Sequence, residues 1–291
     1  MTGLLIVNPM ASGVTEQRLA AVRAELPPGT ETVETGGPGE ATSLARGACG
    51  RFDAIYVFSG DGTYNEVLNG IDALTPVGFL PGGGTSVLPR ALGLPRDPIR
   101  AATRVAVWRR RRISLGRLNG RRFGFSAGIG LDAELVRRVD RLGRRQDGTR
   151  PGDAAFAWTA VKMLADHHAR FDAVLELEGL GRAAFAFVAN CSPYTYLGRL
   201  GLPIAPEASF AQGLDVVAPV RVRARTLPRL AFYVVTGRGQ QHARDVLYAH
   251  DVDRLVVRCD RPQPLQVDGE DLGDVEEAVL EAERDAVTVL V

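Results

Sequence analysis

Three short apolar runs in the first third of the chain are each followed by a glycine-containing loop. These run-and-loop segments are LLIVNPMASG (4–13), AIYVFSGDGT (54–63) and PVGFLPGGGT (76–85). Helix-like patterns separate them, and strand–helix alternation with glycine at the strand ends is typical of a parallel sheet in an α/β domain. The three loops are therefore expected at the carboxyl ends of neighbouring strands, where open α/β sheets bind ligands.

The pattern changes after RRRR (109–112). The helices expected before this point cover 15–26, 65–74, 86–92 and 97–107. Beyond it lie short β-rich runs separated by Gly, Pro and Asn turns, with helical stretches near 132–142 and 153–168. Short strands of this kind are typical of an antiparallel β-sandwich, and 291 residues are enough for two domains. We expect an α/β domain at 1–111 and a β-rich domain at 112–291.

The loop SGDGT (59–63) contains a bare carboxylate, Asp61, although glycine-rich loops of this kind usually hold phosphate. Its two glycines allow a tight turn and close approach of the backbone, and Thr63 with Glu66 matches a capping box at a helix start. A carboxylate repels phosphate unless a divalent cation lies between them, and Mg²⁺ commonly binds one carboxylate together with substrate phosphates. The alternative is a capped strand-to-helix turn without a ligand.

The other two loops favour a nucleotide site over ligand-free turns. Three glycines and a Thr-Ser pair follow the strand at 76–80, and Asn8 and Ser12 are polar candidates in the first loop. Lys162 is the only lysine and lies in AVKMLA, which excludes a Walker-type phosphate loop and a protein kinase. Phosphate binding must then depend on backbone N–H groups, hydroxyl groups, arginine and metal.

The segment LQVDGED (265–271) contains two carboxylates that are two residues apart. Asp-Gly is common in tight hairpin turns, so a plain turn explains the motif. Alternatively, Asp268 and Glu270 lie close enough for their repulsion to raise the pKa of one of them. A raised pKa suits a general base that takes a proton from an alcohol.

Cysteine usage and hydropathy indicate the compartment. Cys49, Cys191 and Cys259 are far apart and form no C-x-x-C pair, which indicates a reducing, intracellular environment. The chain starts without a signal-peptide pattern, and no apolar run reaches the ~18–20 residues that span a bilayer. We expect a cytoplasmic protein, either in solution or peripheral at the inner membrane face.

Arginine is concentrated in residues 100–150, where fifteen arginines and four acidic residues give a local charge of +11. Solvated helix faces and salt bridges explain such a stretch. A peripheral anchor to anionic lipid also explains it, because each basic residue near the surface contributes about 1 kcal/mol. Nucleic acid is disfavoured, since no aromatic residues are interleaved with the arginines.

Five motifs together resemble a known family. They are SGDGTYNEVLNG (59–70), PGGGTSVLPRALGLP (81–95), SAGIGLDAELV (126–136), IAPEASFAQGLDVV (204–217) and QVDGE (266–270). Their order and approximate spacing are similar to those of the diacylglycerol kinase catalytic family, and more narrowly of its bacterial lipid kinases, relatives of the sphingosine kinases. The resemblance covers nearly the whole chain.

The resemblance implies an N-terminal NAD-kinase-like α/β domain that binds nucleotide and a C-terminal β-sandwich that binds lipid. The last strand could return to the first domain, and ATP with Mg²⁺ would bind in the cleft between the domains. The implied reaction transfers the γ-phosphoryl group of ATP to a primary hydroxyl of a diacylglycerol-like or sphingoid lipid at a membrane surface. No particular oligomeric state is predicted.

The resemblance also implies site residues. The catalytic base falls on Asp268 or Glu270, while Asp61, from the argument above, would hold Mg²⁺ directly or through water. The implied nucleotide-binding residues are Asn8, Pro9, Ser12, Gly13, Thr35, Ser59, Gly60, Asp61, Gly62, Thr63, Asn65, Gly84 and Thr85.

Three positions depart from the family pattern. Ser59 replaces the first glycine of GGDGT, and Ser86 replaces the usual Asn after the second glycine loop. Gln212 stands where bacterial relatives carry an Asp that ligates a structural Mg²⁺. Glutamine supplies a neutral carbonyl oxygen in place of a carboxylate, which argues against a structural metal site.

Two alternatives to a lipid kinase are open. An NAD kinase shares a GDGT-type site, although the β-rich motifs and the terminal QVDGE favour a lipid acceptor. A catalytically weak lipid- or nucleotide-binding scaffold would fit the three departures.

Overall fold

The computed structural model describes residues 2–107, 109–143 and 152–291. Two compact units make up the chain. Unit 1 contains the residues up to Leu115 together with Arg284–Val291, and unit 2 contains Gly116–Glu283. The chain passes from one unit to the other within β5 (Arg110–Leu118) and again within β16 (Glu270–Leu290).

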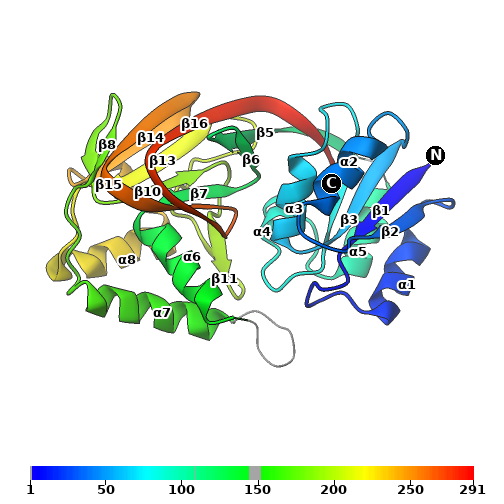
Figure 1. The fold of residues 1–291 in the computed structure, drawn as a ribbon, viewed down its shortest axis with the longest axis horizontal. Coiled ribbons are helices and arrows are strands. Elements are labelled where there is room, and N and C mark those ends of the chain that lie inside the picture. The colour runs from blue at the N-terminus through cyan, green and yellow to red at the C-terminus, as the bar shows by residue number, and fades with distance from the viewer. Residues whose placement is uncertain (1, 108, 144–151) are drawn as a thin grey trace. The chain divides into compact units, whose positions relative to one another are not determined.

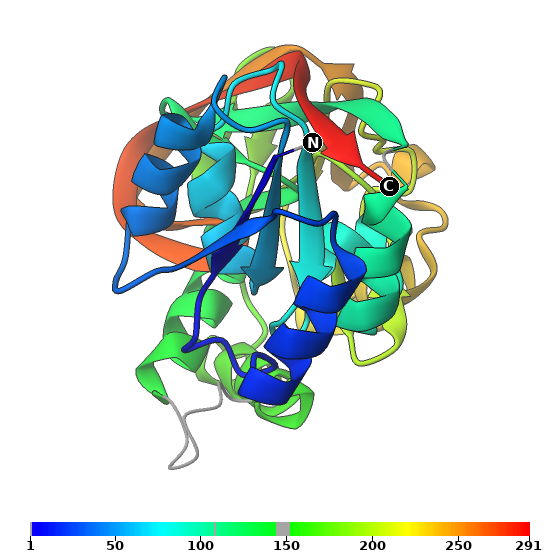
Figure 2. The same ribbon diagram turned by 90° about the vertical axis from the view of Figure 1, so that its right-hand side faces the viewer.

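Unit 1 is a parallel sheet with the strand order β16–β4–β3–β1–β2. Its elements are β1 (Gly3–Val7), α1 (Glu16–Glu25), β2 (Glu31–Glu34), α2 (Glu40–Ala48), β3 (Ala54–Ser59), α3 (Asp61–Leu68), β4 (Val77–Pro81), α4 (Val87–Ala91) and α5 (Pro98–Ala106). Figure 2 shows α2 and α3 on one face of the sheet and α1 and α5 on the other. Strands β1, β3 and β4 are buried along their whole length, as expected for the centre of a parallel sheet. The predicted α/β fold is confirmed.

The start of α3 differs from the sequence prediction. Only Gly60 separates β3 from the helix, and this glycine is the N-cap residue, with an extended backbone. The helix therefore begins at Asp61 instead of residue 65. Thr63 lies inside the first turn, and Glu66 Oε2 accepts a hydrogen bond from Ala41 N at 3.2 Å. The predicted capping box is therefore wrong, because Glu66 supports the start of α2 and not that of its own helix.

Unit 2 is the predicted β-sandwich, built from antiparallel strands in the order β14–β13–β10–β7–β15–β16, with β5, β6, β8 and β9 paired alongside. Its strands and helices are the remainder of β5, β6 (Arg121–Phe123), β7 (Ser126–Ile129), α6 (Leu131–Arg141), α7 (Asp153–Asp166), β8 (Leu175–Leu177), β9 (Gly181–Ala183), β10 (Ala186–Ala189), β11 (Thr195–Leu197), β12 (Leu200–Leu202), β13 (Leu214–Pro219), α8 (Leu227–Thr236), β14 (Val246–Val252), β15 (Arg254–Val267) and most of β16. Figure 1 shows α6, α7 and α8 together on one side of these strands.

An apolar cluster of buried strand residues fills the sandwich, and it includes Val257, Leu265 and Val267 of β15. This packing fixes the end of β15, where Asp268 begins the next turn. Helix α8 is an addition to the two helical stretches expected from the sequence. Within the described residues, no helix combines the length and the apolar character that crossing a membrane requires.

Candidate active site

The three glycine-containing loops of unit 1 meet through their backbones. Gly13 N donates to Gly82 O at 2.7 Å, and Gly82 N donates to Ser59 O at 2.7 Å. A Cβ built on Gly83 would lie 2.7 Å from the Cα of Gly60, and one built on Gly13 would lie 2.8 Å from Gly82 O. Only residues without a side chain allow this approach. The loops therefore form one backbone surface at the carboxyl edge of the parallel sheet.

A cluster of polar side chains joins the first two loops. Asn8 Nδ2 donates to Thr63 Oγ1 at 3.2 Å, and Ser59 Oγ donates to the same oxygen at 2.8 Å. Asn8 Oδ1 accepts from Met10 N at 2.9 Å, which orients the amide. Position 59 thus accommodates a Cβ, and the serine that replaces the family's glycine adds a hydrogen bond to Thr63.

Asp61 is bound to the start of α4. Its Oδ2 accepts from Val87 N at 3.0 Å and its Oδ1 accepts from Leu88 N at 3.2 Å. The first amides of a helix have no carbonyl partner within the helix, so the carboxylate satisfies them and ties the second loop to the third. Carboxylate oxygens are ligands that suit Mg²⁺, so the residue type fits a metal-binding role as well.

Ser86 closes the third loop in a left-handed backbone conformation, with φ 50° and ψ 60°. Residues other than glycine rarely adopt this conformation, and Asn is enriched among those that do. The backbone therefore explains why Asn is usual here in the family. The Ser86 hydroxyl keeps the turn closed by accepting from Gly83 N at 3.2 Å and donating to Gly83 O at 3.3 Å.

The other residues predicted to bind nucleotide surround this surface. Thr35 N donates to Val7 O at 2.8 Å directly after β2, and Asn65 is buried in α3. Thr85 O lies 3.4 Å from Arg90 Nη1, and Gly62 lies in the first turn of α3. The residues that are exposed are Pro9, Ser12 and Gly84.

Tyr64 links the ends of β3 and β4, although it was not among the predicted site residues. Its hydroxyl lies 2.5 Å from Ser59 O and 2.6 Å from Leu80 O. Burial, reinforced by the charge of Asp61, raises the pKa of this phenol well above its usual value, so it stays neutral and donates. In the sequence an aromatic residue here indicates only a core position, which Tyr64 also fills by packing against Phe79.

In unit 2, Asp268 and Gly269 form the two-residue turn between β15 and β16. Both have positive φ, 50° and 79°, which is the geometry that Asp-Gly hairpin turns adopt. The predicted hairpin turn is therefore confirmed.

The Asp268 carboxylate is held by three consecutive backbone amides. Oδ2 accepts from Gly124 N at 2.7 Å, and Oδ1 accepts from Phe125 N at 2.9 Å and from Ser126 N at 3.1 Å. These amides lie at the break between β6 and β7. The three amide donors fix the orientation of the carboxylate, and the residue is only 5% exposed.

Glu270 has a different partner. Its Oε2 accepts from Arg121 Nη2 at 2.6 Å in a partly exposed ion pair between β16 and β6. The two candidate bases are therefore held separately, Asp268 by backbone amides and Glu270 by a guanidinium group.

A polar network that sequence reasoning missed supports this turn. Gln266 Oε1 accepts from Gly269 N at 2.9 Å, and Gln266 Nε2 donates to Asp132 Oδ2 at 2.6 Å. Tyr194 OH donates to the same Asp132 oxygen at 2.6 Å. Desolvation raises the pKa of the Asp132 carboxyl group. Asp132 belongs to the motif SAGIGLDAELV, but its partners are 62 and 134 positions away in the sequence.

The region around Gln212, where the sequence argues against a structural metal site, contains a histidine network. Gln212 Nε2 lies 3.3 Å from His250 Nε2, and His250 Nδ1 lies 2.8 Å from the buried Asp215 carboxylate. Tyr248 OH also donates to Asp215, at 3.1 Å. Ligand atoms of Glu207, Asp215 and His250 lie within 4.8 Å of one another. The contact to Asp215 is a hydrogen bond that His250 Nδ1 donates to the carboxylate, and this bond accounts for the geometry without a metal.

The His250–Asp215 pair predicts that stability falls at alkaline pH. The hydrogen bond to Asp215 raises the pKa of His250, so protonation favours the folded chain. This contribution is fully present below the unfolded-state pKa of about 6.5 and is lost as pH rises through the raised folded-state value. Melting temperatures measured from pH 6 to 9, at roughly half-unit steps, should fall more for the wild type than for His250→Gln. His242→Gln, at an exposed histidine, should keep the wild-type slope, and equal slopes for all three proteins would contradict the prediction.

Comparisons with known proteins agree with this arrangement. Residues 2–118 match the diacylglycerol kinase catalytic domain, and residues 126–291 match the YegS C-terminal NAD kinase beta sandwich-like domain. A diacylglycerol kinase of Bacillus subtilis (strain 168) is 30% identical over 252 residues, which are 83% of this chain and 79% of that protein.

Solved structures show the same fold. A diacylglycerol kinase from Bacillus anthracis str. Sterne matches with a TM-score of 0.71 and 19% identity, covering 99% of this chain and 96% of the other. An NAD kinase from Archaeoglobus fulgidus in complex with ATP matches with a TM-score of 0.50 and 12% identity, covering 99% and 93%. The NAD-kinase-like architecture expected from the sequence is thus confirmed.

Proposed function

The chain belongs to the diacylglycerol kinase catalytic family, and we propose that it transfers the γ-phosphoryl group of ATP to a primary hydroxyl of a diacylglycerol-like or sphingoid lipid. Unit 1 would bind the nucleotide and unit 2 the lipid. The observation that carries the proposal is the set of three amides that fixes the Asp268 carboxylate.

The triphosphate would lie on the backbone surface formed by the three loops of unit 1. The only lysine, Lys162, lies in α7 of unit 2. Phosphate charge would therefore be met by loop amides, by the first amides of α3, by hydroxyl groups and by arginine, and the amides together make an anion site. Mg²⁺ bound with ATP would neutralise charge on the phosphates, and Asp61 is the loop carboxylate that would hold it, directly or through water.

Asp268 is the general base in this proposal. The proton of the acceptor hydroxyl passes to a carboxylate oxygen of Asp268 while the hydroxyl oxygen bonds to the γ-phosphorus. The bond between that phosphorus and the bridging oxygen breaks, and ADP leaves. Because the transition state of phosphoryl transfer is loose, the correct position of the base matters more for catalysis than high basicity. The amides supply that position, whereas Glu270 is engaged with Arg121.

The test is incubation of the protein with γ-labelled ATP, Mg²⁺ and a panel of acceptors comprising diacylglycerol, sphingoid bases and NAD. Label in a lipid is the expected result. Label in NAD alone would identify an NAD kinase, and ATP binding without transfer to any acceptor would identify a catalytically weak scaffold.

A further inference from the structure

Gly124 and Phe125, which supply two of the three amides to Asp268, lie in the gap between two strands. β6 ends at Phe123 and β7 begins at Ser126. Both residues of the gap are buried, and a buried backbone N–H or C=O group needs a hydrogen-bond partner. The position of this loop therefore depends on what its carbonyl groups bind.

Asn190 binds the carbonyl oxygens of both residues. Its backbone N donates to Phe125 O at 2.9 Å, and its side-chain Nδ2 donates to Gly124 O at 2.8 Å. Asn190 directly follows β10, which pairs with β7 in the register Ala189↔Ser126, so the backbone bond continues this ladder. The side chain is fully buried and extends the contact by one more residue. A single asparagine thus holds two successive carbonyl groups of the loop.

Two peptide groups connect Asn190 to the Asp268 carboxylate. The first accepts from Asn190 Nδ2 through Gly124 O and donates to Asp268 Oδ1 through Phe125 N, at 2.9 Å. The second accepts from Asn190 N through Phe125 O and donates to the same oxygen through Ser126 N, at 3.1 Å. Hydrogen bonds in such a chain polarise one another in the protein interior. Both chains end on Oδ1, so a change at Asn190 reaches the carboxylate through the loop.

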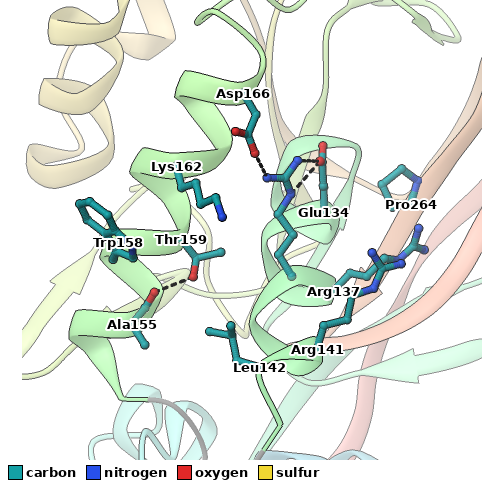
Figure 3. A pocket seen from close by; sticks show the side chains of 11 residues that line it. Glu134, Arg137, Arg141, Leu142, Ala155, Trp158, Thr159, Lys162, Asp166 and Pro264 are labelled. Carbon is teal, nitrogen blue, oxygen red and sulfur yellow. Dashed lines mark hydrogen bonds and ion pairs between the residues drawn. The ribbon is translucent and has the colours of Figure 1, made fainter.

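The backbone of the turn between β15 and β16 is fixed by other contacts. Gly269 N donates to Gln266 Oε1 at 2.9 Å, and Arg137 Nε donates to Asp271 Oδ2 at 2.7 Å. Figure 3 shows Arg137 on α6, where it lines a cavity of about 610 Å³ between α6 and α7. These contacts do not involve Asn190. Loss of its side chain should therefore change the orientation of the carboxylate more than the position of the turn.

We propose that Asn190 is a positioning residue for phosphoryl transfer, which holds the loop 124–126 so that the Asp268 carboxylate is aligned with the acceptor hydroxyl. The inference rests on the proposed function, since that function makes Asp268 the general base. A base must lie within hydrogen-bond reach of the proton that it takes, and a misplacement of about 1 Å costs about 100-fold in rate. Asn190 is fully buried, so it acts through the loop and not by touching the substrate.

The kinetic test compares Asn190→Ala with Gln240→Ala in the full chain. Gln240 is a matched control, because its side chain is also buried and its Nε2 donates to a backbone carbonyl, Ile204 O, at 2.9 Å. Both variants lose one buried amide donor, so both should have a lower melting temperature. Only Asn190→Ala should lower kcat for lipid phosphorylation, by about tenfold to 100-fold, with the KM values for ATP and lipid unchanged. Asn190→Ser, which keeps a hydroxyl group and leaves a smaller cavity, replaces the alanine variant if that variant does not fold, and its kcat should also fall.

A double-mutant cycle with Asp268→Asn distinguishes positioning from a merely structural role. If Asn190 acts through the Asp268 carboxylate, adding Asn190→Ala to Asp268→Asn should change the residual kcat by less than about twofold. Independent roles would instead multiply the two losses, and that result would overturn the proposal. A wild-type kcat in Asn190→Ala, or equal losses of kcat in Asn190→Ala and Gln240→Ala, would also overturn it.

Hydrogen exchange of the loop separates this inference from the proposed function, because it needs no turnover. The amides of residues 124–126 should exchange about tenfold faster in Asn190→Ala than in the wild type, and at the wild-type rate in Gln240→Ala. Faster exchange in a protein that phosphorylates no lipid would support the hold of Asn190 on the loop and refute the kinase. Unchanged exchange in a protein that does phosphorylate lipid would refute the role of Asn190 and leave the proposed function in place.

Discussion

Asp268→Asn is expected to lower kcat for lipid phosphorylation by at least about 100-fold, the usual range for loss of a general base. The same change should also lower the free energy of unfolding. Asparagine has one acceptor oxygen, so its NH₂ group would face at least one of the amides of Gly124, Phe125 and Ser126 that the carboxylate now satisfies. An unsatisfied buried donor costs about 1–3 kcal/mol. Steady-state kinetics and thermal unfolding measure the two effects separately.

Glu270→Gln is the matched control in the same turn. It removes a partly exposed ion pair with Arg121, so the free energy of unfolding should change by no more than about 1 kcal/mol. If Asp268 is the base, this variant should keep most of the wild-type kcat. A loss in Glu270→Gln as large as that in Asp268→Asn, at an unchanged melting temperature, would transfer the role of base to Glu270.

The parts of the fold that were predictable depend on local patterns. Buried apolar runs that end in glycine indicate parallel strands, and the carboxyl ends of such strands lie at one edge of a sheet. The sequence therefore predicts that the loops of Gly13, Ser59 and Gly82 meet, as they do in the structure. The Asp268–Gly269 turn follows from the backbone preferences of these two residue types. In both cases the information lies within a few residues of the sequence.

The partners of the key side chains were not predictable, because tertiary contacts decide them. Thr63 and Glu66 match a capping box, but Glu66 reaches an amide of another helix. The local sequence around Asp61 indicates a metal ligand. In the structure, two backbone amides of α4, which are 26 and 27 positions away in the sequence, donate hydrogen bonds to its carboxylate. Helix α8 was also missed.

Gly83→Ala is expected to destabilise the chain and Gly84→Ala is not, although the two residues are neighbours. A Cβ on Gly83 would lie 2.7 Å from the Cα of Gly60, so a backbone must move, whereas one on Gly84 meets nothing within 4 Å. Overpacking of this kind costs about 1–3 kcal/mol, so Gly83→Ala should lower the melting temperature. Gly84→Ala should leave the melting temperature close to that of the wild type.

The Gly84 variant then tests the phosphate surface itself. If the triphosphate of ATP lies against the exposed backbone of this loop, a methyl group there occupies space that the ligand needs, and clashes of this size correspond to a loss of roughly tenfold to a hundredfold in affinity. The KM for ATP should rise accordingly, while the KM for the lipid stays unchanged, because Gly84 belongs to unit 1 and the lipid is assigned to unit 2. A stable Gly84→Ala protein with the wild-type KM for ATP would show that phosphate does not approach this loop. The loop of Asn8 and the first turn of α3 would then have to bind the phosphates without this loop.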